Sequence, residues 1–183
     1  ALVNVNPSPL VNSNTINQTI CSNENTNITL TSTVSNTLFS WTVTQNNVTG
    51  ALSGSGNNIN QTLANNTTII GLATYNVTPI ATGCSGLPLL ISVNVKPKPR
   101  LTNNLNTTIC SLQTTNIPLT SNIVGSTFSW TATTTGPTGF SNAQGNTIAQ
   151  QLQNNANYYG TVTYNVTPTN NGCNGVESSI SVK

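Results

Sequence analysis

Four cysteines have the clearest capacity for chemistry in this chain. Cys21 and Cys84 recur 89 residues later as Cys110 and Cys173, so two copies of one pattern each hold a pair at the same spacing. The chain has no histidine and no C-x-x-C pair, which disfavours zinc ligation. We therefore predict one disulfide per copy, Cys21–Cys84 and Cys110–Cys173, each stabilising its copy by roughly 4 kcal/mol. Disulfides form in oxidising compartments, which implies an exported, extracellular protein.

Groups for acid–base chemistry are scarce. The only acidic side chains, Glu24 and Glu177, align with Gln113 and Pro88 in the other copy, so neither belongs to a repeated site. Most glycosidases need two placed carboxylates, activated nucleophiles need a base, and calcium sites usually need several carboxylates. We expect no enzymatic activity, no catalytic residue, no cofactor and no metal.

The charge pattern also excludes two classes of partner. Net charge is +2, and three of the four cations lie close together at Lys96, Lys98 and Arg100. No basic face is available for a phosphate backbone, so we expect no nucleic-acid partner. No apolar run approaches the ~20 residues of a membrane span.

Aromatic and threonine residues raise the question of ligand binding. Trp41 and Trp130 could stack on sugar rings, but their strict alternation with polar residues favours burial. We predict a core that contains Phe39, Trp41, Tyr75, Phe128, Trp130 and Tyr164. Tyr158 and Tyr159 of the second copy occupy the positions of Ile69 and Ile70 in the first. This substitution suggests that the side chain at one or both positions packs against the domain and that the other is an exposed contact residue. Outward threonines such as Thr42 and Thr44 could bind ice or polysaccharide, although β-propensity explains them more simply.

The elements that must position these residues follow from the repeat. Self-similarity at a period of 89 residues indicates two copies of one small domain. We divide the chain into the tail and linker of a preceding repeat (1–9), a first repeat (10–96) and a second repeat (97–183), and we expect Pro97 and Pro99 to form a stiff linker. Apolar residues alternate with Thr, Asn and Ser, without a helical period, which predicts an all-β fold of two antiparallel β-sandwiches.

Three motifs carry a family resemblance. They are F-S-W-T at Phe39, I-x-Q-x-L-x-N-N at Ile59, and Y-N-V-T-P-x-x-x-G-C-x-G at Tyr75, each repeated in the second copy. In these motifs the chain resembles the PKD-like repeats of giant surface adhesins in Bacteroidota. The resemblance implies an immunoglobulin-like sandwich within a giant adhesin or gliding-type surface protein, which is exported as a type IX secretion substrate. The chain departs from better-known PKD domains in lacking the W-D-F-G-D-G turn, since Thr42 follows Trp41.

Three functions remain open at this point. The first is a structural repeat of a long extracellular adhesin or filament on the cell surface, whose partners are neighbouring repeats. The second is a polymerising subunit whose terminal strand, 1–5 or 178–183, completes a neighbour's sheet. The third is a module that binds surface glycans or ice.

Overall fold

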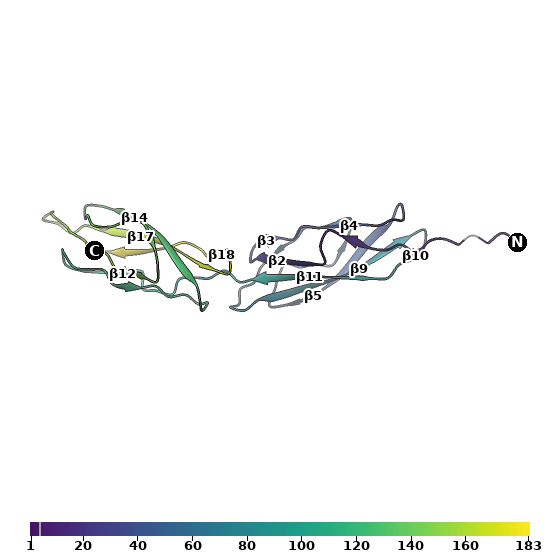
Figure 1. Ribbon diagram of the computed structural model, residues 1–183, viewed down its shortest axis with the longest axis horizontal. Helices are drawn as coiled ribbons and strands as arrows, with labels where there is room; N and C mark the ends of the chain where they lie inside the picture. The colour runs from purple at the N-terminus through teal and green to yellow at the C-terminus, as the bar shows by residue number, and fades with distance from the viewer. Residues whose placement is uncertain (4) are drawn as a thin grey trace. The chain divides into compact units, whose positions relative to one another are not determined.

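The computed structural model describes residues 1–3 and 5–183 and divides into two compact units, Ala1–Pro97 and Lys98–Lys183 (Figure 1). Each unit is built from β-strands and turns. Unit 1 contains β1 (Asn12–Ser13), β2 (Asn17–Cys21), β3 (Glu24–Asn25), β4 (Ile28–Thr31), β5 (Leu38–Asn46), β6 (Gly54–Ser55), β7 (Asn58–Ile59), β8 (Thr62–Leu63), β9 (Gly71–Ala81), β10 (Cys84–Ser85) and β11 (Leu89–Lys96). Unit 2 contains β12 (Asn106–Thr107), β13 (Ile117–Pro118), β14 (Thr127–Thr134), β15 (Ala143–Gln144), β16 (Thr147–Ile148), β17 (Val162–Asn170), β18 (Cys173–Asn174) and β19 (Ser178–Val182).

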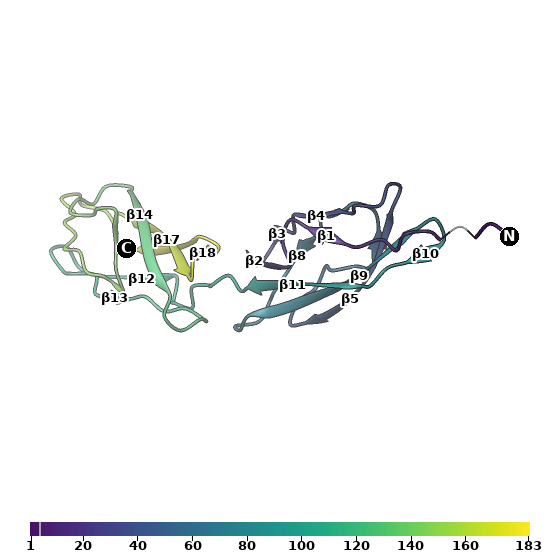
Figure 2. The same cartoon turned by 45° about the vertical axis from the view of Figure 1, so that its right-hand side comes forward.

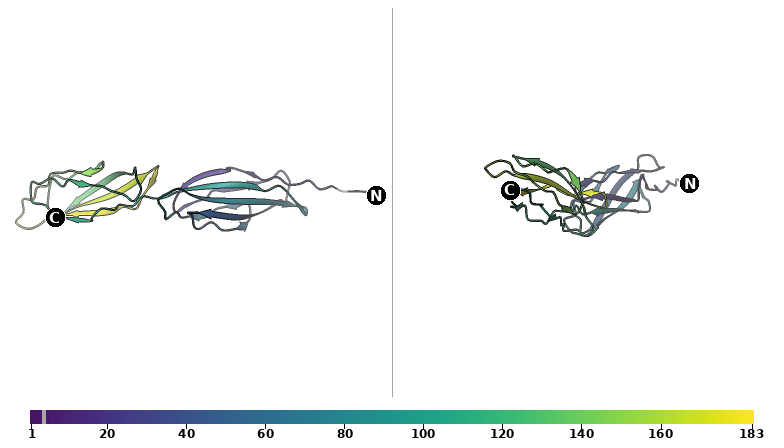
Figure 3. Two further views of the ribbon diagram at one scale, coloured as in Figure 1. Left: turned by 90° about the horizontal axis from the view of Figure 1, so that it is seen from below. Right: turned by 60° about the vertical axis from the view of Figure 1, so that its left-hand side comes forward.

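Unit 1 is a sandwich of two layers. The larger sheet has the strand order β2-β11-β9-β5-β6, and β10 pairs with β9. The other layer consists of β1-β4-β7 and the short β3-β8 ladder, which lie on the opposite side in Figure 2. Unit 2 repeats the larger sheet as β12-β19-β17-β14-β15 with β18 on β17, and its β13 pairs with β16. Figure 3 shows the ribbon from two further directions. The predicted all-β class and the two-sandwich organisation are confirmed.

The sandwiches are not purely antiparallel. In unit 1, β2 pairs parallel with β11, and in unit 2, β12 pairs parallel with β19. The first and last strands of each larger sheet therefore run in the same direction. The chain enters each sandwich at one end and leaves it at the other.

Strand β19 is part of its own sheet. It pairs with β17 along its whole length and with β12 at Ser181 and Val182. Completion of a neighbour's sheet by residues 178–183 stays a prediction.

Alternating burial along the strands forms the core. Strand β9 buries every second residue over its whole length. All six aromatic residues that the sequence placed in the core are buried, and Tyr75 and Tyr164 have no exposed surface. We expected at least one of the two positions held by Ile69 and Ile70 in unit 1, and by Tyr158 and Tyr159 in unit 2, to be packed. This expectation is wrong, because all four side chains are exposed. They lie on the segment before β9 and β17, outside the two packed layers.

Candidate functional site

The cysteines do not pair as their spacing suggested. Cys21 and Cys173 are each disulfide-bonded, whereas Cys84 and Cys110 are free thiols. The predicted bonds Cys21–Cys84 and Cys110–Cys173 are therefore wrong. Each copy contributes one bonded and one free cysteine.

The sheet register explains why the two cysteines of one copy cannot meet. Cys21 lies level with Lys96 at the end of β11, one step beyond the Val95–Gly71 pair. Cys84 pairs with Ala81, at the other end of β9. Ten steps along β9 separate these levels by about 33 Å, whereas a disulfide needs Cα atoms about 4.4–6.8 Å apart.

Unit 2 has the same separation. The amide of Ile109, next to Cys110, donates to the carbonyl of Lys183 at the end of the chain. Cys173 pairs with Asn170 at the far end of β17. We call the end that holds Cys84 or Cys173 the entry end, and the end that holds Cys21 or Cys110 the exit end.

The entry end is a tight hairpin packed on the incoming chain. Cys84 follows the two-residue turn Thr82-Gly83, where both residues have positive φ angles of 49° and 82°. Two residues after Cys84, Gly86 leaves no room for a side chain, because a Cβ atom there would lie 1.8 Å from the carbonyl oxygen of Pro9. This close approach accounts for the second glycine of the G-C-x-G motif.

Unit 2 builds its entry end in the same way. Asn171 and Gly172 adopt φ angles of 48° and 81° before Cys173. A Cβ atom on Gly175 would lie 1.9 Å from the carbonyl oxygen of Pro99. The incoming segment is thus clamped to the hairpin that carries the cysteine.

An exposed apolar side chain follows each entry-end cysteine by three residues. Leu87 is 77% exposed in unit 1 and Val176 is 67% exposed in unit 2. Both units thus present one exposed apolar side chain at the same position of the entry end.

The exit end is held by a side chain that reaches back to the cysteine. The carboxylate oxygen Oε2 of Glu24 accepts a hydrogen bond from the amide of Cys21 at 2.9 Å. In unit 2 the amide oxygen of Gln113 accepts from the amide of Cys110 at the same distance. An uncharged side chain performs this role equally, so the carboxylate of Glu24 serves here as a loop anchor.

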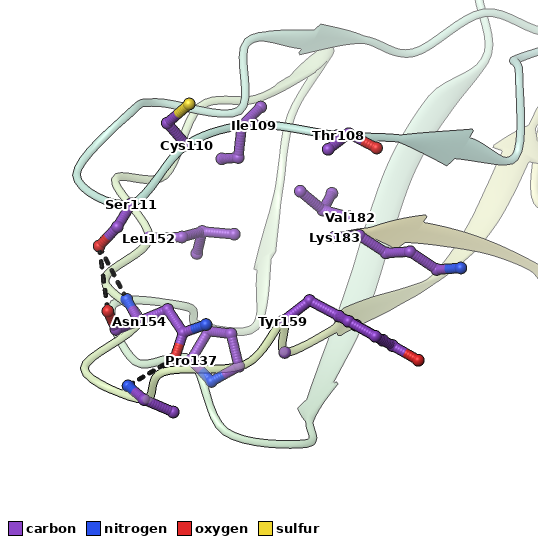
Figure 4. A pocket seen from close by; sticks show the side chains of 12 residues that line it. Thr108, Ile109, Cys110, Ser111, Pro137, Leu152, Asn154, Tyr159, Val182 and Lys183 are labelled. Carbon is purple, nitrogen blue, oxygen red and sulfur yellow. Dashed lines mark hydrogen bonds between the residues drawn. The ribbon is translucent and has the colours of Figure 1, made fainter.

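A hollow of about 500 Å³ opens at the exit end of unit 2 (Figure 4). Ile109, Leu152 and Val182 form an apolar side of it, and Cys110 and Tyr159 also line it. The Ser111 hydroxyl accepts a hydrogen bond from the amide of Asn154 at 3.0 Å and fixes the loops around it. Cys110 thus lies at the rim of the hollow, and its sulfur points away from Leu152 and Val182 in Figure 4.

A polar network repeats inside each sandwich and was not predicted as a unit. The hydroxyl of Tyr75 donates to Oε1 of Gln61 at 2.8 Å, and Nε2 of Gln61 donates to the carbonyl of Leu52 at 2.9 Å. The indole Nε1 of Trp41 donates to the same carbonyl at 3.1 Å. Buried polar groups are costly unless they are hydrogen-bonded, and here each one is satisfied.

The second copy reproduces this network. Tyr164 donates to Gln150 at 3.0 Å, and both Gln150 and Trp130 donate to the carbonyl of Ser141. The glutamine of the I-x-Q-x-L motif therefore links the core tryptophan to the core tyrosine. The motif contained the signal, but its partners become visible only in three dimensions.

Burial also changes the acidity of both tyrosines. Desolvation raises the pKa of Tyr75 and of Tyr164 from 10.0 to about 12. The cause is burial of the phenol, which disfavours the phenolate.

The sugar-stacking interpretation of the two tryptophans loses its basis in this geometry. Trp41 and Trp130 are 7% and 5% exposed and have no open ring face for a sugar.

Among the residues that the structure describes, no group of three or more His, Cys, Asp or Glu side chains is placed to hold a metal ion. The same described residues include no helix that is long and apolar enough to cross a membrane.

Comparison with known proteins identifies the class of domain. A family model described as PKD-like domain matches residues 18–99 and again residues 107–183. The chain belongs to the PKD-like domain family and contains two tandem copies of it. No curated protein sequence matches the chain.

Two solved structures are similar to nearly the whole chain. One comprises fibronectin(III)-like modules of CbhA from Clostridium thermocellum, with 11% identity, a TM-score of 0.33, and coverage of 95% of this chain and 92% of that chain. The other is human mucin-like protocadherin EC1-2, with 15% identity, a TM-score of 0.31, and coverage of 95% and 97%.

Proposed function

We propose that this chain is a structural part of a long extracellular surface protein, in which PKD-like repeats provide length and display a distal adhesive tip. One observation carries the proposal. Each sandwich takes in the chain at one end and releases it at the other, because its first and last strands are parallel. Every added copy can then extend the molecule by about the length of one sandwich.

The composition and the cysteines support the same proposal. Charged residues are 3% of the chain, and the acidic residues needed for most acid–base chemistry are nearly absent. Disulfide-bonded Cys21 and Cys173 are consistent with an oxidising, extracellular setting. The motif resemblance to giant Bacteroidota adhesins supports a host protein that is a cell-surface adhesin exported by type IX secretion.

The test measures the native gene product and its assembly. We expect a polypeptide with many more PKD-like copies than two, seen by electron microscopy as a thin surface fibre. A short native product that remains compact would overturn the proposal. Binding of the purified protein to a glycan array would instead favour the glycan-binding function.

A further inference from the structure

The unpaired cysteines lie at the two ends where a further repeat would join. Cys110 is exposed at the exit end of unit 2, and Cys84 is partly exposed at the entry end of unit 1. Their counterparts in the other copy, Cys21 and Cys173, are both disulfide-bonded. The exit-end cysteine is therefore bonded in unit 1 and free in unit 2, and the entry-end cysteine is free in unit 1 and bonded in unit 2.

We propose that Cys110 and Cys84 are the ends of a head-to-tail series of disulfides between repeats. In this series the exit-end cysteine Cys110 bonds to the entry-end cysteine of a further repeat, and the entry-end cysteine Cys84 bonds to the exit-end cysteine of another. The proposal rests on the proposed function, since it requires further copies of the repeat.

The exit-end hollow is suited to receive one particular occupant, the entry hairpin of the following copy. That hairpin carries a cysteine and, three residues later, an exposed apolar side chain such as Leu87 or Val176. The hollow offers apolar contacts from Ile109 and Leu152, and Cys110 lies at its rim. An apolar side chain that enters the hollow would bring the hairpin's cysteine toward Cys110.

The chemistry of the bond is balanced by an external disulfide. Two thiols form one S–S bond and release two protons and two electrons, and a small disulfide such as oxidised glutathione accepts the electrons and becomes two thiols. Such a bond would resist separation of neighbouring repeats under tension.

The experiment uses the 183-residue protein in a glutathione redox buffer at high protein concentration. Wild-type chains carry one free cysteine at each end, so we expect a ladder of covalent multimers on a non-reducing gel. Peptide mapping should find Cys84 of one chain joined to Cys110 of another.

Two variants separate specific pairing from random oxidation. Cys84→Ser and Cys110→Ser should each remain monomeric, whereas an equal mixture should give dimers and no longer species. Dimers in either variant alone, at the wild-type rate, would overturn the proposal, because they require like ends to meet. Absence of multimers from wild type would overturn it too, while the length of the native gene product would still test the proposed function separately.

A matched pair of tyrosine variants tests the hollow. Tyr159 lines it, whereas its exposed neighbour Tyr158 does not. Tyr159→Ser should slow ladder formation several-fold, and Tyr158→Ser should leave the rate unchanged. Equal rates for both variants would show that the bond forms without docking in the hollow.

Discussion

At the scale of single residues, glutamine has a role that its polarity alone does not reveal. Gln61 and Gln150 each join a buried tyrosine to the carbonyl that also accepts from the core tryptophan. In the sequence, Gln61 alternates with Ile59 and Leu63, which predicts that it points inward with them. It could not identify the partners, because Tyr75 and Leu52 come from other segments of the chain.

Replacing this glutamine should destabilise its sandwich. Gln61→Leu keeps a similar volume but leaves the hydroxyl of the buried Tyr75 without its acceptor, whereas the exposed amide of Leu52 can bond to water instead. An unsatisfied buried group costs about 1–3 kcal/mol, so we expect a loss of this size in denaturant unfolding. Asn60→Ala, at an exposed neighbour, is the matched control and should change stability by less than about 0.5 kcal/mol. An equal effect of both variants would contradict a role for the network.

At the scale of elements, the alternation of apolar and polar residues predicted the strands correctly, whereas the equal spacing of the cysteines predicted the wrong disulfides. Period-2 patterns identified the inward rows of β5, β9 and β11, because side-chain direction depends only on local geometry. The ends at which Cys21 and Cys84 lie depend instead on the parallel β2–β11 register, a long-range property. Equal spacing in both copies showed that the cysteines are equivalent between copies, but it did not show that they are close within one.

The hairpin turn at the entry end offers a comparison between the two copies. Both residues of this turn have positive φ angles, the geometry of a type I′ turn, which favours Asn-Gly. Unit 2 has Asn171-Gly172, whereas unit 1 has Thr82-Gly83, and a β-branched residue is strained in the left-handed region.

Thr82→Asn should therefore stabilise unit 1, by about 1 kcal/mol given the usual cost of this region for L-residues. The reciprocal change Asn171→Thr should destabilise unit 2 by a similar amount. Chemical denaturation of the two variants and of wild type measures both effects. A loss of stability in Thr82→Asn would show that the threonine side chain makes a contact worth more than the backbone strain.

At the scale of the whole molecule, the scarcity of charge determines how stability responds to pH. The chain has two acidic side chains and no histidine, so few groups can change protonation between about pH 5 and pH 7. Stability should be nearly constant in this range, and salt should have little effect because few charges exist to screen.

Above this range the two buried tyrosines should control stability. Their pKa is raised from 10.0 to about 12 in the folded state, so the unfolded chain loses the phenolic protons first as pH rises. The stability due to the neutral phenols is fully present below pH 10 and is lost as pH rises from 10 toward 12. Thermal melts from pH 5 to pH 11.5 should show a plateau followed by a fall in the midpoint. In Tyr75→Phe/Tyr164→Phe the midpoint at neutral pH should be lower, because two hydrogen bonds are lost, and the alkaline fall should be much shallower. An unchanged alkaline fall in this variant would contradict the role of the two buried tyrosines.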